Sequence, residues 1–148
     1  MKKAFRIITL FVAVASMAFI TSCKKDNENL IIGKWQFDNV NLSITVDDPE
    51  IQAMVDQFIN GEILLLNAEL KNTQLEFKGD GTYTLIDEDG TNPGTYSIDG
   101  DKITLDGDLA TIKTLTKNAL VIEMSETLTE EDDGMDGTMV MTMEYTRL

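Results

Sequence analysis

After residue 30 the chain alternates hydrophobic and polar positions with the period of two that indicates β-strands. The first such run extends from Leu30 to Val46, and its early hydrophobic positions, Trp35 and Phe37, share one face. The later ones have the opposite parity: Val40, Leu42, Ile44 and Val46. Because strand side chains alternate strictly, this change of phase requires one extra residue. We therefore predict one long strand with a bulge at Asp38-Asn39.

A helical period replaces the alternation after Val46. Asp48, Pro49 and Glu50 suit an N-cap, the first helical position and the first turn. An apolar stripe with helical spacing follows: Ile51, Met54, Val55, Phe58 and Ile59. Asn60-Gly61 is typical of a helix stop. The segment from Glu62 to Leu70 is then either a second helix or a continuation past a kink, although a buried strand at residues 64–66 fits the same apolar run.

The remaining chain is predicted to be β. Seven more strands are expected at 75–77, 83–85, 94–98, 102–105, 110–115, 119–124 and 138–147, with a loop over residues 87–93. Eight short strands joined by tight turns favour an antiparallel barrel or sandwich. We predict a mainly all-β fold, an eight-stranded antiparallel barrel with a helical insertion after the first strand. A closed barrel of this size either fills its interior with side chains or holds one small ligand.

The first 22 residues have the pattern of a signal peptide. Basic residues precede an apolar run from Ile7 to Ile20, which is too short to span a bilayer core of about 30 Å. The run ends at Ile20-Thr21-Ser22-Cys23, which resembles the lipobox of bacterial lipoproteins, whose cysteine receives a diacylglyceryl group. We expect a signal peptide over 1–22, lipidation at Cys23, a polar tether over 23–29 and a barrel domain over 30–148. Several acyl chains make a stable membrane anchor.

Charge and composition exclude several function classes. The formal net charge is −14, and it becomes −17 once the three basic residues of the signal peptide are removed. Such a field repels phosphate backbones and anionic head groups, so nucleic-acid binding is disfavoured and membrane contact is expected from the lipid. The chain has no histidine, and its single cysteine is Cys23. Histidine-based catalysis is therefore absent, and we expect a non-catalytic protein.

Gly33-Lys34-Trp35 on the first strand, the hairpins that follow and Arg147 near the C-terminus together resemble the lipocalins, and more closely the lipocalin-like domains of Bacteroidota lipoproteins. The resemblance implies that Trp35 plugs the closed end of the barrel and that Arg147 packs over its indole in a cation–π contact. It also implies a binding function. Gly33, Trp35 and Arg147 are then structural residues, and a ligand would enter at the other end.

A methionine face on the last strand is the most suggestive feature for binding. Met139, Met141, Met143 and Tyr145 share one parity, and flexible thioethers adapt to varied apolar ligands. Core filling explains the same pattern. The inward aromatic residues predicted to lie with this face in the barrel interior are Phe77, Tyr83 and Tyr96.

Two acidic loops are candidates for calcium. One contains Asp87, Asp89 and Asn92, and the other contains Asp132, Asp133 and Asp136. Calcium takes six to eight oxygen ligands, often around a glycine turn. Neither loop has the twelve-residue EF-hand spacing, and Asp-Gly is also ordinary turn chemistry.

We expect a lipid-anchored protein of the bacterial cell envelope, an outer membrane lipoprotein that is periplasmic or surface-exposed. The expected role is non-catalytic binding of a small apolar or amphipathic ligand in the barrel. The alternative is a filled barrel whose outer surface binds a protein or glycan partner.

Overall fold

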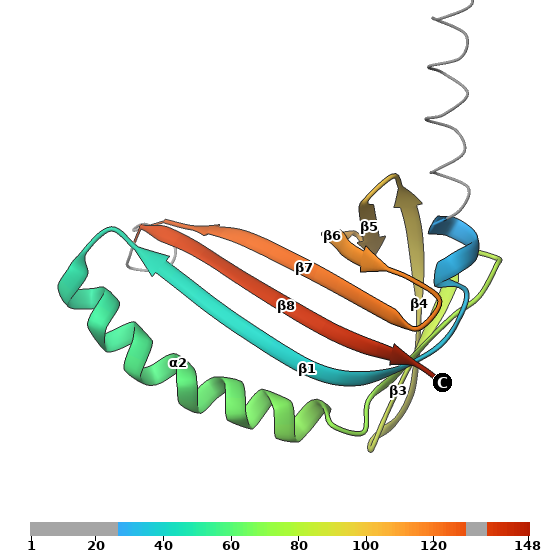
Figure 1. The fold of residues 1–148 in the computed structure, drawn as a ribbon, viewed down its shortest axis with the longest axis horizontal. Coiled ribbons are helices and arrows are strands. Elements are labelled where there is room, and N and C mark those ends of the chain that lie inside the picture. Colours follow the sequence, from blue (N-terminus) through green and yellow to red (C-terminus); the bar gives the residue numbers. More distant parts are fainter. Residues whose placement is uncertain (1–26, 130–135) are drawn as a thin grey trace, which may run out of the picture.

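The computed structural model describes residues 27–129 and 136–148, which form a closed antiparallel barrel in the strand order β1 to β8 (Figure 1). The elements are β1 (Gly33–Val46), α2 (Pro49–Leu70), β2 (Gln74–Phe77), β3 (Thr82–Asp87), β4 (Gly90–Asp99), β5 (Lys102–Leu105), β6 (Asp108–Leu115), β7 (Ala119–Leu128) and β8 (Gly137–Arg147). Each strand pairs with the next, and β8 closes the barrel on β1. The predicted fold class, with a helix after the first strand, is confirmed.

The first strand bends where the sequence predicts it. Along β1 the register with β8 shifts between Phe37 and Asn39, so Asp38 is the extra residue of a bulge. Trp35 and Phe37 before the bulge and Val40 after it are all buried. The bulge therefore keeps both hydrophobic sets on the inner face of one continuous strand.

The helical insertion is one uninterrupted helix, so the predicted stop at Asn60-Gly61 and the alternative strand at 64–66 are both wrong. The Asp48 carboxylate caps the N-terminus by accepting hydrogen bonds from the backbone N–H groups of Glu50 and Ile51 at 2.8 and 3.3 Å. The helix continues through Gly61 because glycine inside a helix costs only about 1 kcal/mol relative to alanine. Burial of the apolar residues on both sides of it outweighs that cost: Ile59, Leu66 and Leu70.

Helix α2 covers the free edge of β1 with two side-chain amides. β2 pairs only with Gly33–Gln36, which leaves the rest of this edge without a neighbouring strand. Asn67 Nδ2 donates to the Val40 carbonyl at 3.0 Å, and its Oδ1 accepts from the Val40 N–H at 2.9 Å. Gln52 bonds the Ile44 carbonyl and the Val46 N–H at 3.0 and 2.9 Å. The two amides satisfy backbone groups that a ninth strand would otherwise bond.

We predict that Asn67→Ala lowers the free energy of unfolding by about 2 kcal/mol, because both backbone groups of the buried Val40 lose their partner. Urea denaturation measures the change. Asn60→Ala is the matched control, since Asn60 is exposed on the same helix and its side-chain amide donates to the Asp56 carbonyl of that helix. Equal effects of the two substitutions would contradict the edge-capping role.

The predicted loop over residues 87–93 is instead a tight hairpin. β3 runs to Asp87 and β4 begins at Gly90, because the Asp87 carboxylate accepts from the N–H groups of Asp89 and Gly90, both at 2.9 Å. Pro93 lies inside β4, opposite Thr84. β5 pairs only with the later part of β4, from Tyr96, so Pro93 sits in an edge segment where proline is tolerated.

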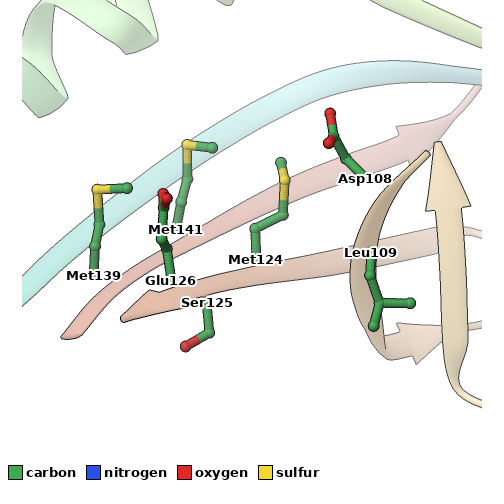
Figure 2. Close-up of a pocket in the computed structure, with 7 residues that line it drawn as sticks. All are labelled: Asp108, Leu109, Met124, Ser125, Glu126, Met139 and Met141. Carbon is green, nitrogen blue, oxygen red and sulfur yellow. The ribbon is translucent and has the colours of Figure 1, made fainter. Parts of the chain in front are cut away.

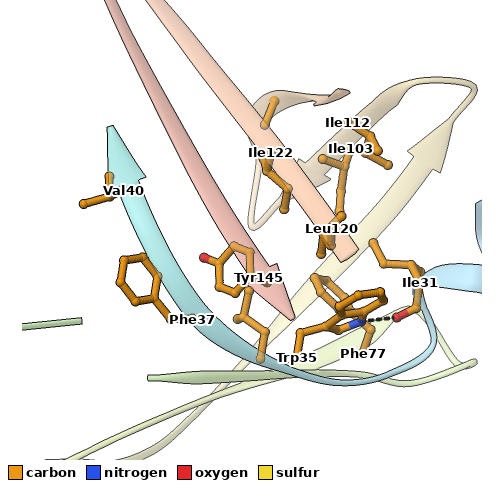
Figure 3. Close-up of a cluster of buried hydrophobic side chains, with 12 residues drawn as sticks. Ile31, Trp35, Phe37, Val40, Phe77, Ile103, Ile112, Leu120, Ile122 and Tyr145 are labelled. Atoms are coloured by element: carbon orange, nitrogen blue, oxygen red, sulfur yellow. Dashed lines mark hydrogen bonds between the residues drawn. The ribbon is translucent and has the colours of Figure 1, made fainter. Parts of the chain in front are cut away.

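The hydrophobic core fills the barrel at the Trp35 end. Its largest fully buried side chains come from β1, β2, β5, β7 and the turn before β1: Trp35, Phe77, Ile31, Ile103, Leu120, Ile122 and Val40 (Figure 3). Phe37 and Tyr145 close this core with an edge-to-face contact at 5.9 Å between ring centroids. The cluster of buried core side chains therefore lies towards this end of the barrel.

Candidate functional site

Strands β1, β7 and β8 extend together beyond the other strands of the barrel. β6 last pairs with β7 where Thr111 lies opposite Glu123, whereas β7 continues beside β8 to Leu128. In this extension Met124 lies opposite Met141 and Glu126 lies opposite Met139. The start of β6, at Asp108 and Leu109, no longer pairs with β7 here. A gap therefore opens in the wall beside the methionine-bearing strands.

A pocket of about 390 Å³, open to solvent, occupies this gap. Its lining residues are Asp108, Leu109, Met124, Ser125, Glu126, Met139 and Met141. Figure 2 shows the side chains of Met124, Met139, Met141 and Glu126 rising from the same side of β7 and β8, whereas Ser125 points the other way. The three methionines are half-buried. The site thus combines a soft apolar floor with two carboxylates at its margin.

The other residues predicted to line a ligand site lie elsewhere. Tyr145 is buried, and its hydroxyl donates to the Met143 sulfur at 3.5 Å. Phe77 is buried against Tyr96 and Tyr83, with ring centroids 4.9 and 5.9 Å away. Tyr96 lines a separate surface pocket near Ile32 and Gly79. Of the predicted ligand-lining set, Met139 and Met141 are the members that line the 390 Å³ pocket.

Tyr83 forms part of a hydrogen-bonded group that joins β3 to the turn between β5 and β6. Its hydroxyl donates to Asp106 Oδ2 at 2.7 Å, and Asp106 Oδ1 accepts from the Thr95 N–H at 2.7 Å. The Thr95 N–H and the Tyr83 hydroxyl lower the pKa of Asp106. Burial, followed by the hydrogen bond and negative charge of Asp106, raises the pKa of Tyr83 to about 12. This arrangement keeps Tyr83 protonated at neutral pH and gives it a structural position.

Arg147 packs over Trp35 at this end of the barrel. The guanidinium carbon of Arg147 lies 4.4 Å from the centroid of the Trp35 ring. Arg147 also donates to the carbonyls of Ile32, at 3.1 Å, and Leu30, and the indole Nε1 donates to the Ile31 carbonyl at 2.7 Å (Figure 3). Arg147 and Trp35 thereby bond the carbonyls at the end of the helical turn over 27–31.

Gly33 makes that contact possible. Its backbone has a φ of +137°, a conformation that L side chains rarely adopt. A β-carbon at this position would lie 2.7 Å from Arg147 Nη1. The glycine of the Gly33-Lys34-Trp35 motif is therefore required by its backbone angle, and the absence of a β-carbon leaves room for the Arg147 guanidinium.

The candidate calcium residues do not assemble into an ion site in the part of the chain that the structure describes. Asp87 uses its carboxylate to close the β3–β4 turn, and Asn92 lies within β4 opposite Leu85. Asp132 and Asp133 lie outside the described residues, whereas Asp136 immediately precedes β8. Over 27–129 and 136–148, no group of three or more His, Cys, Asp or Glu side chains is placed to hold a metal ion.

The pocket is also lined by five residues outside the set predicted from the sequence: Asp108, Leu109, Met124, Ser125 and Glu126. Met124 has the same parity as the buried Leu120 and Ile122 on β7, so the alternation could have identified it. Glu126 also has this parity, and a carboxylate in an otherwise apolar series signals a departure from core packing. Asp108 and Leu109 reach the pocket because β6 diverges from β7, which no local pattern reveals.

Cys23, the predicted lipidation site, lies outside the described residues. Among the helices of the described segments, none is both long and apolar enough to cross a membrane.

Comparison with known proteins identifies the domain. The profile of the lipocalin-like domain family matches residues 31–122. The chain is also similar to a solved structure, the crystal structure of a DUF4847 family protein from Bacteroides vulgatus, with 17% identity and a TM-score of 0.42. That similarity covers 78% of this chain and 94% of the other. No curated protein matches the chain.

Proposed function

The chain belongs to the lipocalin-like domain family, and we propose that it is a non-catalytic binding protein that holds a small apolar or amphipathic molecule beside Met124, Met139 and Met141. The observation that carries this proposal is the pocket itself. Its volume of about 390 Å³ falls within the range of about 300 to 1,000 Å³ typical of small-molecule sites. Thioethers fit ligands of varied shape because methionine is flexible and polarisable.

The margin of the pocket favours an amphipathic molecule that is neutral or cationic. Glu126 and Asp108 both line it, and the whole chain has a net charge of −14. An anionic head group at this margin would be repelled, whereas a hydroxyl, an amide or an amine has carboxylates as partners. The ligand's apolar part would lie against the three methionines.

The neutral, apolar dye N-phenyl-1-naphthylamine tests the proposal, because its fluorescence rises when it leaves water. We expect saturable binding at one site per chain, and we expect Met141→Gln to weaken it about tenfold, since a buried amide without a partner is costly. Met54→Gln is the matched control, because Met54 is exposed on α2. Unchanged binding by Met141→Gln, in a variant with an unaltered circular dichroism spectrum, would overturn the proposal.

We also propose that the protein is held in the bacterial cell envelope by lipid on Cys23, with residues 23–29 as a tether. The basic and apolar pattern of residues 1–22 and the sequence Ile20-Thr21-Ser22-Cys23 support this. Cys23→Ala is expected to move the protein from the membrane fraction to the soluble fraction. Retention of this variant in membranes would refute anchoring through that residue.

A second candidate function, binding of a protein or glycan partner on the outer surface, is favoured by one observation. The outward face of α2 exposes four large apolar side chains: Met54, Phe58, Leu64 and Leu65. Exposed apolar patches on a surface helix are common at interaction sites. Met54→Gln alters this face and leaves the pocket intact. The variant therefore separates the two candidates: it should weaken partner binding on α2 and leave dye binding in the pocket unchanged.

A further inference from the structure

We propose that the thioethers of Met124, Met139 and Met141 also form a site for a soft monovalent metal ion, Cu(I). This inference shares the pocket of the proposed function but assigns it a different class of ligand. It rests on the sulfur atoms of the three side chains, whereas the binding of an apolar molecule rests on their hydrophobic surface. A substitution that keeps the surface and removes the sulfur separates the two.

Strand register brings the three sulfur-bearing side chains together. Met124 and Met141 are directly opposed on β7 and β8, and Met139 is the next residue of the same parity on β8. Opposed residues have β-carbons about 5 Å apart, and diagonal neighbours about 7–8 Å apart, which long side chains can bridge. Figure 2 shows the three side chains on one side of the sheet. The open pocket leaves them room to turn their sulfurs towards one point.

The donor set selects the ion. Thioether sulfur is a soft, neutral ligand that favours Cu(I) over hard divalent ions. Glu126 lies opposite Met139 and lines the same pocket, so it adds a negative charge near a bound cation. The chain has no histidine, so copper binding through imidazole is absent. Thioethers bear no proton at any ordinary pH, and their affinity for the ion therefore persists in mild acid, unlike that of cysteine or histidine.

Met143 marks the boundary of the site. It shares the parity of Met139 and Met141, but its sulfur accepts the hydrogen bond of the Tyr145 hydroxyl at 3.5 Å. It packs against the core and does not line the pocket. Met143 and the exposed Met54 thus serve as internal references, since a metal held in the pocket leaves both unaffected.

The test is a titration of the purified protein with Cu(I) under anaerobic, reducing conditions, in competition with the chelator bicinchoninate. We expect one equivalent to bind, with ¹³C-methyl NMR signals of Met124, Met139 and Met141 shifting and that of Met54 unchanged. The triple variant Met124→Leu, Met139→Leu, Met141→Leu is expected to lose about a hundredfold or more in Cu(I) affinity. The same variant should keep its dye binding, because leucine preserves apolar volume.

Met54→Leu with Met143→Leu is the matched control, and it should bind Cu(I) like the unmodified protein. Equal Cu(I) affinity of the triple variant and the unmodified protein would overturn the inference, as would a shift of the Met54 signal in place of the pocket methionines. If the dye binds and Cu(I) does not, the metal inference fails alone. If Cu(I) binds and the dye does not, the proposed function fails alone.

Discussion

Replacement of Trp35 by alanine is expected to lower the free energy of unfolding by about 4 kcal/mol, the largest effect of any single substitution considered. Trp35 is fully buried, and its ring lies beneath the Arg147 guanidinium, 4.4 Å from its carbon. The substitution removes the largest core side chain and leaves the Ile31 carbonyl without the indole donor. Because small domains have about 5–15 kcal/mol of stability in total, the barrel should become marginal.

Circular dichroism in urea is the appropriate measurement, since Trp35 is the only tryptophan and its loss removes intrinsic tryptophan fluorescence. Phe58→Ala is the matched aromatic control. Phe58 is 67% exposed on α2, and we expect its replacement to change stability by no more than about 0.5 kcal/mol. A loss below about 1 kcal/mol for Trp35→Ala would contradict the role of the tryptophan as the plug of the barrel.

The strands and the bulge could be predicted from sequence because they follow from a local rule. Alternation with period two assigns each residue of β1 to a face, and the change of parity between Phe37 and Val40 leaves room for only one extra residue. The predicted helix stop at Asn60-Gly61 was wrong because the prediction rested on local helix propensity alone. Burial of Ile59 and Leu66 on the barrel carries the helix past the glycine.

The position of α2 against the barrel could not be predicted from alternation or helix propensity. It is set by the side-chain amides of Asn67 and Gln52, which bond the edge of β1. Asn67 bonds Val40, 27 residues earlier in the chain, and Gln52 bonds Ile44, 8 residues earlier. Nothing in the helical period distinguishes these amides from solvent-exposed ones. The pocket was predicted in part for a similar reason. Parity places Met139 and Met141 on the same face of β8. Asp108 and Leu109 join them in the pocket because the first residues of β6 do not pair with β7.

The two ends of strand β8 lie in different parts of the structure. Arg147 ends β8 over Trp35, next to the helical turn over 27–31 and hence next to the proposed tether. Met139 lies near the beginning of the same strand, where it lines the pocket. The pocket and the contact between Arg147 and Trp35 therefore lie towards opposite ends of β8.

Alkaline pH is expected to destabilise the protein between pH 10 and about 12. Burial raises the pKa of Tyr145 to about 12, with a smaller contribution from Tyr83, and an unfolded tyrosine has a pKa of about 10. A group whose pKa is raised on folding contributes stability below its unfolded pKa, and that contribution disappears as pH rises through its folded pKa. For the buried Tyr145 the difference amounts to about 3 kcal/mol.

Tyrosinate absorbance and circular dichroism, recorded together against pH, measure this effect. All three tyrosines have raised pKa values, because Tyr96 is also shifted upward by burial. Ionisation of Tyr145 should therefore coincide with loss of the β-sheet spectrum, since the phenolate cannot stay in a core formed with Phe37. Tyr145→Phe removes the ionising group and should extend the folded state to higher pH. Ionisation of all three tyrosines near pH 10 with the sheet intact would contradict the burial of Tyr145.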